Sequence, residues 1–407
     1  MKQWIIVFLV MALAWSCNTA KVVPMKPGVV MKEKPGYFDV VADLLNYMIE
    51  DYDLLKKNIK IGFINREGKE LISPEFDFCS NFYGSYANVV KDSVRGIIDG
   101  QGHATYFPGY DKVYFFYPEA GIAKKAKKMG LIGRDGALVS ELIYDQILVS
   151  YDPYYKVKLN GAWRVINERA ESVLPSSIEL EGTIVYNSTT SFVKKIEGKR
   201  KKGMINMKGE VVIPALFDEL TGSFSEGLMR VVRDQKVGFV DKAGNEVIPL
   251  EYEDVGYTFY EQKVRAKKNG KWGFINTSNE VVVDFIYDQV GEFSEGLAMV
   301  LSNRKAGYVD PNGVVKISLQ LDFISANKFN DGLAVYLNED QKFGYMDTSG
   351  DVAIAPLFDS AESFSNGKAH VGLNGKSTII NAKGEFALPL TYRAVWASDN
   401  NYLRFVR

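Results

Sequence analysis

The sequence predicts an all-β protein assembled from tandem repeats, and three observations lead to this fold class. The chain of 407 residues is longer than one hydrophobic core usually serves. Aromatic residues make up 13% of it and glycines number 36, a combination typical of many strands separated by tight turns. A short motif, clearest as KWGFIN at residues 271–276, recurs along most of the chain. A repeat array accounts for all three observations.

The charge composition narrows the class of partner. Lys and Arg total 49 and Asp and Glu total 50, which gives a formal net charge of −1. Strong binding to a phosphate backbone needs an excess of positive charge, and the whole chain has none. Nucleic acid is therefore not expected as a partner.

The first 17 residues have the features of an export signal. Lys2 is followed by an apolar run at residues 4–14 that is too short to span a bilayer. The segment LAWSC then ends at Cys17 and resembles the signal of a bacterial lipoprotein. The resemblance implies that Cys17 becomes the N-terminus and carries acyl chains that anchor the protein to a membrane. A cleaved signal without lipid is the alternative.

Two short regions precede the repeats. Residues 18–36 contain three prolines and four lysines, which favours an extended tether. Within residues 37–58 apolar residues recur three and four positions apart, as at Val41, Leu44, Leu45 and Met48, and this spacing predicts a helix with one apolar face. We expect the helix to cap an exposed end of the array, although a helix that binds a partner would show the same pattern.

A recurring glycine sets the period of the array from residue 59 to residue 407. The aligned positions lie 34 to 39 residues apart, and Arg164 and Thr378 replace the glycine in two of ten copies. A large aliphatic residue follows two positions later in every copy, so this position is expected to face a core. The aligned glycines are Gly62, Gly96, Gly130, Gly203, Gly238, Gly273, Gly307 and Gly344, and Trp272 precedes one of them.

A second glycine marks a tight turn. The residue three positions after the first glycine is Asn or Asp in nine of ten copies, and the second glycine follows three positions later. This spacing is typical of a hairpin loop built on a type I turn, in which the last residue is left-handed. Two copies have another residue in place of the second glycine. Asn279 tolerates the left-handed conformation, and Ala170 adopts it less easily. The turn glycines are Gly68, Gly102, Gly136, Gly209, Gly244, Gly313, Gly350 and Gly384.

Each copy indicates three antiparallel strands, for example at residues 297–301, 306–310 and 314–318. Along a middle strand, successive side chains alternate between the two faces, so Gly273 is expected to leave room for a neighbouring unit to pack close. A meander of about 35 residues buries too little apolar surface to be stable alone. The units are therefore expected to stack in a line and share their apolar faces.

With these positions the chain resembles the WG-repeat family. The family pattern is clearest in KWGFIN at residues 271–276, VIP at 247–249, FD at 217–218 and FSEGLA at 293–298. The resemblance covers about residues 60–407. It implies a bacterial repeat protein that is associated with the surface or the envelope of the cell, and it implies no reaction.

The repeats allow an open or a closed array. The chain enters the pattern on a middle strand at residues 59–65 and leaves it on an outer strand at 402–407, so the last strand could complete the first unit, as in a closed propeller. Ten units exceed the usual number of propeller blades, and the helix at 37–58 resembles a cap. We therefore favour an open, curved solenoid of about ten three-stranded antiparallel meanders over residues 59–407.

Few reactive side chains lie outside the repeat pattern. The two histidines are interpreted as a turn residue, His103, and a half-exposed strand residue, His370, and their spacing does not suit zinc. Cys79 is interpreted as a small core residue. No cofactor, metal site or catalytic residue is expected.

Three residue types recur once per repeat and are interpreted as structural. Acidic residues at the junction of a strand and a loop are expected to accept backbone N–H bonds and not to form a catalytic pair. Lysines two positions before the aligned glycine are expected to lie at turns beside a carboxylate. Phenylalanines that open a Phe-x-x-Gly turn are expected in the core, with sugar-stacking platforms as the alternative. The three series are Asp77, Asp111, Asp145, Asp218, Asp288, Asp322 and Asp359; Lys60, Lys128, Lys201, Lys236, Lys271, Lys305, Lys342 and Lys376; and Phe224, Phe293, Phe329 and Phe364.

These observations favour a non-enzymatic, membrane-anchored repeat scaffold. We expect it to be a monomer that binds a protein or a polysaccharide at the bacterial cell envelope, at the outer membrane in preference to the inner membrane. The alternative is a carbohydrate-active protein, either lectin-like or hydrolytic. A hydrolase would need one non-repeating pair of carboxylates about 5 to 10 Å apart in a cleft.

Overall fold

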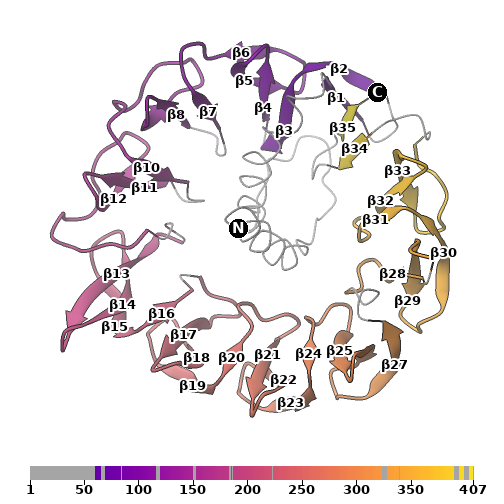
Figure 1. Cartoon of the computed structure of the whole chain (residues 1–407). Coiled ribbons are helices and arrows are strands. Elements are labelled where there is room, and N and C mark those ends of the chain that lie inside the picture. Colours follow the sequence, from indigo (N-terminus) through magenta and orange to yellow (C-terminus); the bar gives the residue numbers. More distant parts are fainter. Residues whose placement is uncertain are drawn as a thin grey trace, which may run out of the picture. The chain divides into compact units, whose positions relative to one another are not determined.

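The computed structural model describes residues 60–65, 69–83, 85–115, 120–149, 153–182, 185, 187–221, 223–322, 328–338, 340–388, 394–397 and 403–406. The regular secondary structure of these residues is β-strand, as predicted (Figure 1). None of them belongs to a helix that is long and apolar enough to cross a membrane. The predicted signal with Cys17, the tether at 18–36, the capping helix at 37–58 and Gly68 lie outside the described residues.

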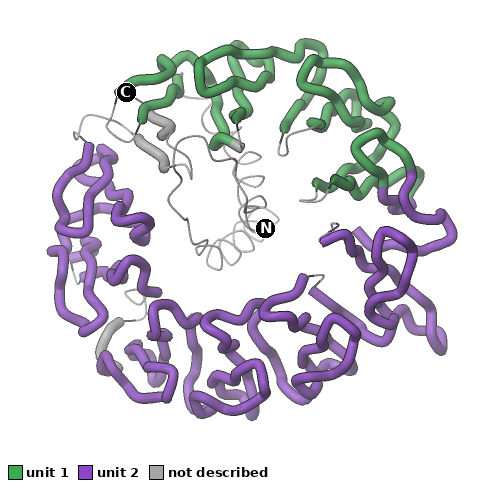
Figure 2. Tube along the Cα trace, turned by 180° about the vertical axis from the view of Figure 1, so that it is seen from behind, with its two compact units in different colours: residues 1–161, 166–171, 392–407 green, residues 162–165, 172–391 purple. Residues whose placement is uncertain are grey.

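The chain divides into two compact units, which Figure 2 shows in separate colours. Unit 1 comprises residues 1–161, 166–171 and 392–407, and unit 2 comprises residues 162–165 and 172–391. Within the described residues, the strands form small antiparallel sheets of three or four strands each.

In unit 1 the first sheet contains strands from both ends of the array. β1 (Ile61–Ile64) pairs with β2 (Glu70–Phe76) on one side and with β35 (Leu403–Val406) on the other, and β34 (Ala394–Ala397) pairs with β35. The last strand of the chain thus completes the sheet of the first repeat, a pairing that the sequence pattern allowed. The following sheets consist of β3 (Phe78–Tyr83), β4 (Tyr86–Lys91), β5 (Val94–Asp99) and β6 (Ala104–Tyr106); of β7 (Lys112–Tyr114), β8 (Gly121–Lys125) and β9 (Lys128–Ile132); and of β10 (Gln146–Leu148), β11 (Tyr154–Leu159) and β12 (Ala162–Asn167), where the boundary with unit 2 falls.

In unit 2 each sheet is a meander of consecutive strands. A two-residue strand, β16, β20, β24 or β31, precedes four of these meanders and pairs with the first long strand. The sheets consist of β13 (Thr189–Ile196), β14 (Lys199–Asn206) and β15 (Val211–Phe217); β16 (Glu219–Leu220), β17 (Met229–Arg233), β18 (Lys236–Val240) and β19 (Glu246–Tyr252); β20 (Asp254–Val255), β21 (Lys263–Lys268), β22 (Lys271–Asn276) and β23 (Val281–Tyr287); β24 (Gln289–Val290), β25 (Ala298–Ser302), β26 (Lys305–Val309) and β27 (Val315–Asp322); β28 (Leu333–Leu337), β29 (Phe343–Asp347) and β30 (Val352–Phe358); and β31 (Ser360–Ala361), β32 (Lys368–Leu373) and β33 (Lys376–Asn381).

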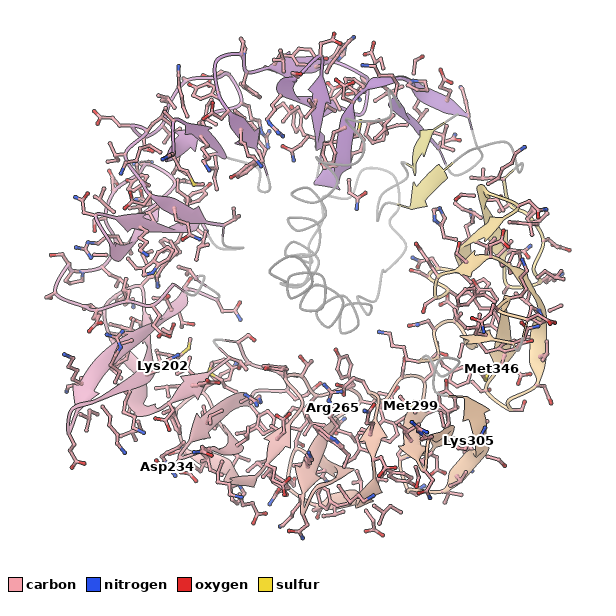
Figure 3. The ribbon with its side chains drawn as sticks, in the orientation of Figure 1. Lys202, Asp234, Arg265, Met299, Lys305 and Met346 are labelled. Carbon is pink, nitrogen blue, oxygen red and sulfur yellow. The ribbon has the colours of Figure 1, made fainter. Side chains whose placement is uncertain are left out.

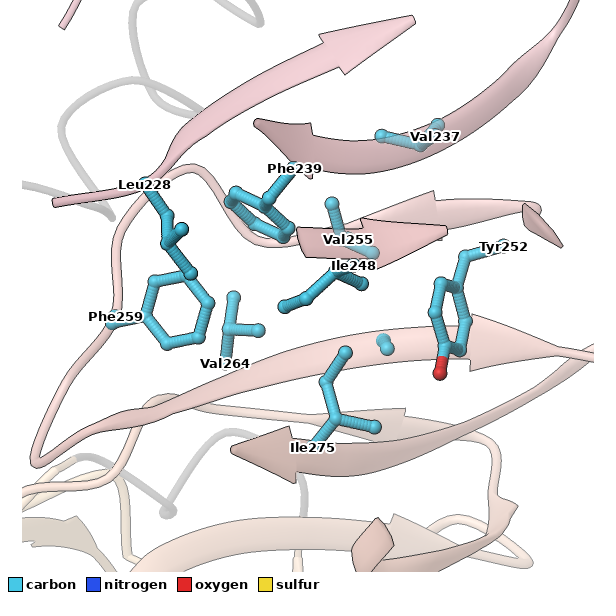
Figure 4. Packing of buried hydrophobic residues seen from close by; sticks show 10 residues of the cluster. Leu228, Val237, Phe239, Ile248, Tyr252, Val255, Phe259, Val264 and Ile275 are labelled. Carbon is cyan, nitrogen blue, oxygen red and sulfur yellow. The ribbon is translucent and has the colours of Figure 1, made fainter. Parts of the chain in front are cut away.

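The core of unit 2 lies between consecutive sheets. Phe239, Ile248 and Tyr252 of the sheet β16–β19 pack against Val264 and Ile275 of the sheet β20–β23, as Figure 4 shows. Equivalent clusters join β20–β23 to β24–β27 and β28–β30 to β31–β33. The expectation that repeats share their apolar faces is therefore confirmed within unit 2.

The Asx-Gly turn recurs with one geometry. The Gly209 N–H donates to the Asn206 carbonyl at 3.0 Å, and Asn206 Oδ1 accepts from the N–H groups of Lys208 and Glu210. This closure places the last residue of the turn in the left-handed region, where Ala170 also lies with a φ of 63°. The described turn glycines have φ between 77° and 91°: Gly102, Gly136, Gly209, Gly244, Gly313, Gly350 and Gly384.

The glycine of the Trp-Gly pair has a different role from the one expected. A Cβ on Gly273 would lie 2.5 Å from the Val283 carbonyl oxygen, which belongs to the outer strand of the same meander. The register shifts at this point, because Trp272 pairs with Tyr287 whereas Phe274 pairs with Val283. The bulged outer strand therefore crosses directly over the glycine. The expectation that Gly273 makes room for a neighbouring repeat is wrong. The outer strand of the same meander approaches the glycine equally closely at Gly62, Gly203, Gly238 and Gly344.

Candidate binding surface

The recurring Lys and Asp residues tie consecutive sheets together at their hairpin ends. Lys271 Nζ lies 2.6 Å from Asp288 Oδ1, and Asp288 Oδ2 accepts the backbone N–H of Asn303 in the next hairpin at 2.9 Å. The hydrogen bond from Lys271 lowers the pKa of the Asp288 carboxyl. The structural interpretation of these series is confirmed at the pairs Lys60–Asp77, Lys128–Asp145, Lys201–Asp218, Lys271–Asp288 and Lys342–Asp359.

The Phe-x-x-Gly turns of unit 2 form a row at the opposite end of the first long strands. At three places an acidic side chain of one turn accepts the glycine N–H of the equivalent turn in the next sheet. This links one sheet to the next through a carboxylate that recurs, so the carboxylate is structural. The three hydrogen bonds run from Gly296 to Glu261 at 3.1 Å, from Gly332 to Glu295 at 2.9 Å and from Gly367 to Asp331 at 2.7 Å.

The recurring phenylalanines are core residues. Phe293 is 2% exposed, and its ring lies edge-to-face against Phe274, with 4.7 Å between the ring centroids. The core interpretation is therefore confirmed for Phe293, Phe329 and Phe364, whose rings are not presented for stacking on sugars, whereas Phe224 is half-buried against a core cluster. Equivalent contacts join Phe259 to Phe239, Phe329 to Tyr308 and Phe364 to Tyr345.

One position on the first long strand of each meander changes its chemistry from repeat to repeat. It lies directly before the residue that pairs with the aligned glycine position of the middle strand, and it holds Arg230, Arg265, Met299, Val335 and His370 in the five sheets from β16–β19 to β31–β33. Figure 3 labels two of them, Arg265 and Met299. We call this set the variable position. This position is not apparent from the sequence, because a residue that differs from copy to copy leaves no periodic signal.

The two arginines at the variable position reach the next sheet. Arg230 Nη2 lies 2.9 Å from Asp254 Oδ1, and its guanidinium lies 4.8 Å from the centre of the Tyr257 ring. Arg265 Nε lies 3.2 Å from Glu292 Oε1, and its guanidinium lies 5.6 Å from the Trp272 ring. Polar groups are thus placed between consecutive sheets, beside the apolar clusters that the sheets share.

Glu292 is the most perturbed carboxyl of this surface. Its side chain is 23% exposed, while Oε2 is buried without a hydrogen-bond partner among the described residues. Burial raises the pKa of Glu292 to about 7, and the positive charges of Arg265 and Lys328 act in the opposite direction. Because Glu292 is not at the recurring acidic position, nothing in the sequence distinguishes it from the other acidic residues.

Glu292→Gln is expected to flatten the pH dependence of stability. The folded-state pKa of about 7 lies above the ordinary value of 4.5, so this group stabilises the folded state relatively more below pH 4.5, and that contribution is lost as the pH rises to 7. The variant should remove about 1–3 kcal/mol of the change in unfolding free energy between pH 5 and pH 8. Urea denaturation across this pH range measures it. Glu226→Gln, on an exposed turn of the same unit, is the control, and an unchanged slope in Glu292→Gln would contradict the assignment.

The histidines and Cys79 fit structural roles. His103 Nδ1 lies 3.0 Å from Asp99 Oδ2 at an Asx turn, and the side chain is 83% exposed, so the turn interpretation is confirmed. His370 is more buried than expected, with a side chain 10% exposed and Nδ1 4.0 Å from Glu362 Oε1. Cys79 is fully buried in an apolar cluster of unit 1, as predicted. The described part of the chain contains no group of three His, Cys, Asp or Glu side chains suited to a metal ion.

Comparison with known proteins identifies the repeat. No curated protein matches the chain. Solved structures to which the chain is similar include a eukaryotic initiation factor (13% identity, 66% of this chain and 84% of that one, TM-score 0.38), Kluyveromyces lactis Hsv2p (7%, 65% and 94%, 0.32) and BamB from Moraxella catarrhalis (8%, 86% and 99%, 0.28). The family model of the WG containing repeat matches residues 61–94, 129–163, 203–236, 238–272, 272–305 and 343–376, about half of the chain. The chain belongs to the WG-repeat family.

Proposed function

We propose that this protein is a non-enzymatic repeat scaffold that is anchored to a bacterial membrane through Cys17 and binds a protein or a polysaccharide at the cell envelope. The observation that carries the proposal is that the recurring polar residues have structural partners. Asp288 joins a lysine to the next hairpin, and Glu295 holds the next turn. These residues maintain the framework and are not available as a repeated reactive site.

The variable position supports a binding role. A regular framework that presents different side chains at equivalent places is how repeat proteins recognise macromolecules. The five sheets from β16–β19 to β31–β33 hold cationic, thioether, aliphatic and imidazole groups there: Arg265, Met299 and His370 are half-buried, and Arg230 and Val335 are buried. The set combines charge with apolar surface, which suits a protein or a glycan more than a small ion.

An exchange of two side chains between equivalent places tests the binding proposal. The double variant Arg265→Met and Met299→Arg keeps the composition and exchanges the groups at two equivalent places, and because it also removes the contact between Arg265 and Glu292, thermal unfolding of both proteins is measured beside binding. Purified wild-type protein should retain one defined envelope component on a glycan array or in a pull-down, and the double variant should lose it. Equal retention by both proteins would place the partner elsewhere.

Cys17→Ala is expected to release the protein from membranes. Without the acyl chains implied by the LAWSC segment, no covalent anchor remains. Fractionation of cells that express each variant measures the shift from the membrane pellet to the soluble fraction. Cys79→Ala is the matched control, because Cys79 lies in the core and its variant should stay with the membrane. Retention of Cys17→Ala in the pellet would count against lipidation.

Carbohydrate hydrolysis is a second candidate, and Glu292 is the observation that favours it. A carboxyl that occurs once, with a pKa of about 7, has the property of a general acid for a glycosidic bond. Release of reducing sugar ends from envelope glycans by the wild type, but not by Glu292→Gln, would support this function. Glycan binding without release supports the scaffold.

A further inference from the structure

One hairpin of unit 2 departs from the repeat. β13 and β14 pair over eight residue pairs, from Thr189 with Asn206 to Ile196 with Lys199, as the long arrows in Figure 1 show. The other hairpins between the first and second long strands of unit 2 have five or six pairs. The extra length carries residues 194–202, KKIEGKRKK, which we call the basic hairpin. A feature that occurs once in an array is not required by the repeat.

The basic hairpin carries positive charge that the protein does not neutralise. Six of its nine residues are Lys or Arg, and Glu197 in the turn is its one acidic residue. Half of the basic side chains have acidic partners elsewhere in unit 2: Arg200 with Glu179, Lys201 with Asp218 and Lys202 with Glu181. The others are exposed and make no ion pair within the described part of the chain: Lys194, Lys195 and Lys199.

The arrangement of these charges opposes the stability of the hairpin. Lys194 lies directly opposite Lys201, and Lys195 lies directly opposite Arg200. Like charges at opposed positions destabilise an antiparallel pair. The strands are nevertheless closed by a favourable two-residue turn, in which Glu197 has a φ of 50° and Gly198 a φ of 77°. Lys194 and Lys195 face like charges and make no ion pair within the described residues, so the fold would be more stable without them, which indicates a role outside the fold.

We infer that the basic hairpin docks onto the anionic phospholipid headgroups of a membrane surface. Successive side chains of a strand project from opposite faces, so of the three lysines without an ion pair Lys194 and Lys199 lie on one face of the ribbon and Lys195 lies on the other. A partner that engages all three must contact both faces of the hairpin. A fluid layer of lipid phosphates does so, whereas the surface of a folded protein meets one face. Clustered Lys and Arg side chains are attracted to such a layer.

The basic hairpin would be a second membrane contact in addition to the proposed lipid anchor, and its binding is tested in protein that lacks the anchor. Protein carrying Cys17→Ala is mixed with vesicles of phosphatidylcholine, with or without phosphatidylglycerol, and the bound fraction is measured by sedimentation. We expect binding that requires phosphatidylglycerol and falls with added salt. Lys194→Glu, Lys195→Glu and Lys199→Glu together should weaken it roughly tenfold or more. The same changes place opposite charges across the ladder, so the thermal midpoint should rise.

A matched variant separates location from total charge. Lys208→Glu, Lys242→Glu and Lys383→Glu change the net charge by the same amount at exposed Asx-Gly turns of the same unit, and they should leave vesicle binding intact. An equal loss in both triple variants, binding to phosphatidylcholine alone, or binding to an acidic polysaccharide but not to vesicles would overturn the inference. Cell fractionation of Cys17→Ala reports on the lipid anchor alone, so failure of that anchor leaves the vesicle result standing.

Discussion

Gly273→Ala is expected to destabilise the protein by about 3 kcal/mol, the upper part of the range for overpacking a well-filled site. The added Cβ would lie 2.5 Å from the Val283 carbonyl oxygen and 2.8 Å from the backbone of Asp284. Both contacts are with the backbone of a bulged strand, which cannot turn aside as a side chain can. That strand is hydrogen-bonded at both ends of the bulge, where Tyr287 and Val283 pair with β22. Urea denaturation of the full chain measures the loss.

Gly291→Ala is the matched control for this prediction. Gly291 lies in the same unit and has no positive φ, and an added Cβ would meet Met299 Cβ at 3.4 Å, which is ordinary contact. Its substitution should change stability by about 0.5 kcal/mol or less. If both variants lose the same stability, close approach of the outer strand is not the reason for the glycine of the Trp-Gly pair.

The local rules of the repeat could be predicted from the sequence. The Asx-Gly turn depends on the positions of Asn206 and Gly209 within four residues, so its geometry follows from nearby residues alone. A contact between a turn lysine and a carboxylate, such as Lys271–Asp288, could also be predicted, because both residues recur at fixed places beside turns. Periodicity also predicted that apolar faces are shared, which the cluster around Phe239 and Ile275 confirms.

The partner of each contact could not be predicted in the same way. The glycine period shows that space is needed at Gly273, but the strand that fills the space depends on a register shift between β22 and β23. Glu292 owes its raised pKa to burial between two sheets, and no residue beside it in the sequence signals that burial. The longest spacing of the array lies between Arg164 and Gly203 and contains the basic hairpin, but the like-charged pairs of the hairpin follow only from the register of β13 and β14.

Phe386→Ala supplies the baseline for the second large effect. Phe386 is 51% exposed, so truncation of its ring removes little buried surface and should change stability by less than about 1 kcal/mol. The same substitution at a buried ring of the same unit isolates the contribution of burial, because the lost atoms are identical in the two variants.

Phe293→Ala is expected to destabilise unit 2 by about 3–5 kcal/mol. The ring is 2% exposed and packs edge-to-face on Phe274, so the variant leaves a cavity between the sheets β20–β23 and β24–β27 and loses an aromatic pair. In an array whose sheets hold each other through such contacts, the damage should be greatest at the two sheets that share the cavity. Hydrogen exchange should therefore show faster exchange in β22 and β25 than in β32 and β33. Uniform loss of protection across unit 2 would mean that its sheets unfold as one cooperative body and not as neighbours coupled in sequence.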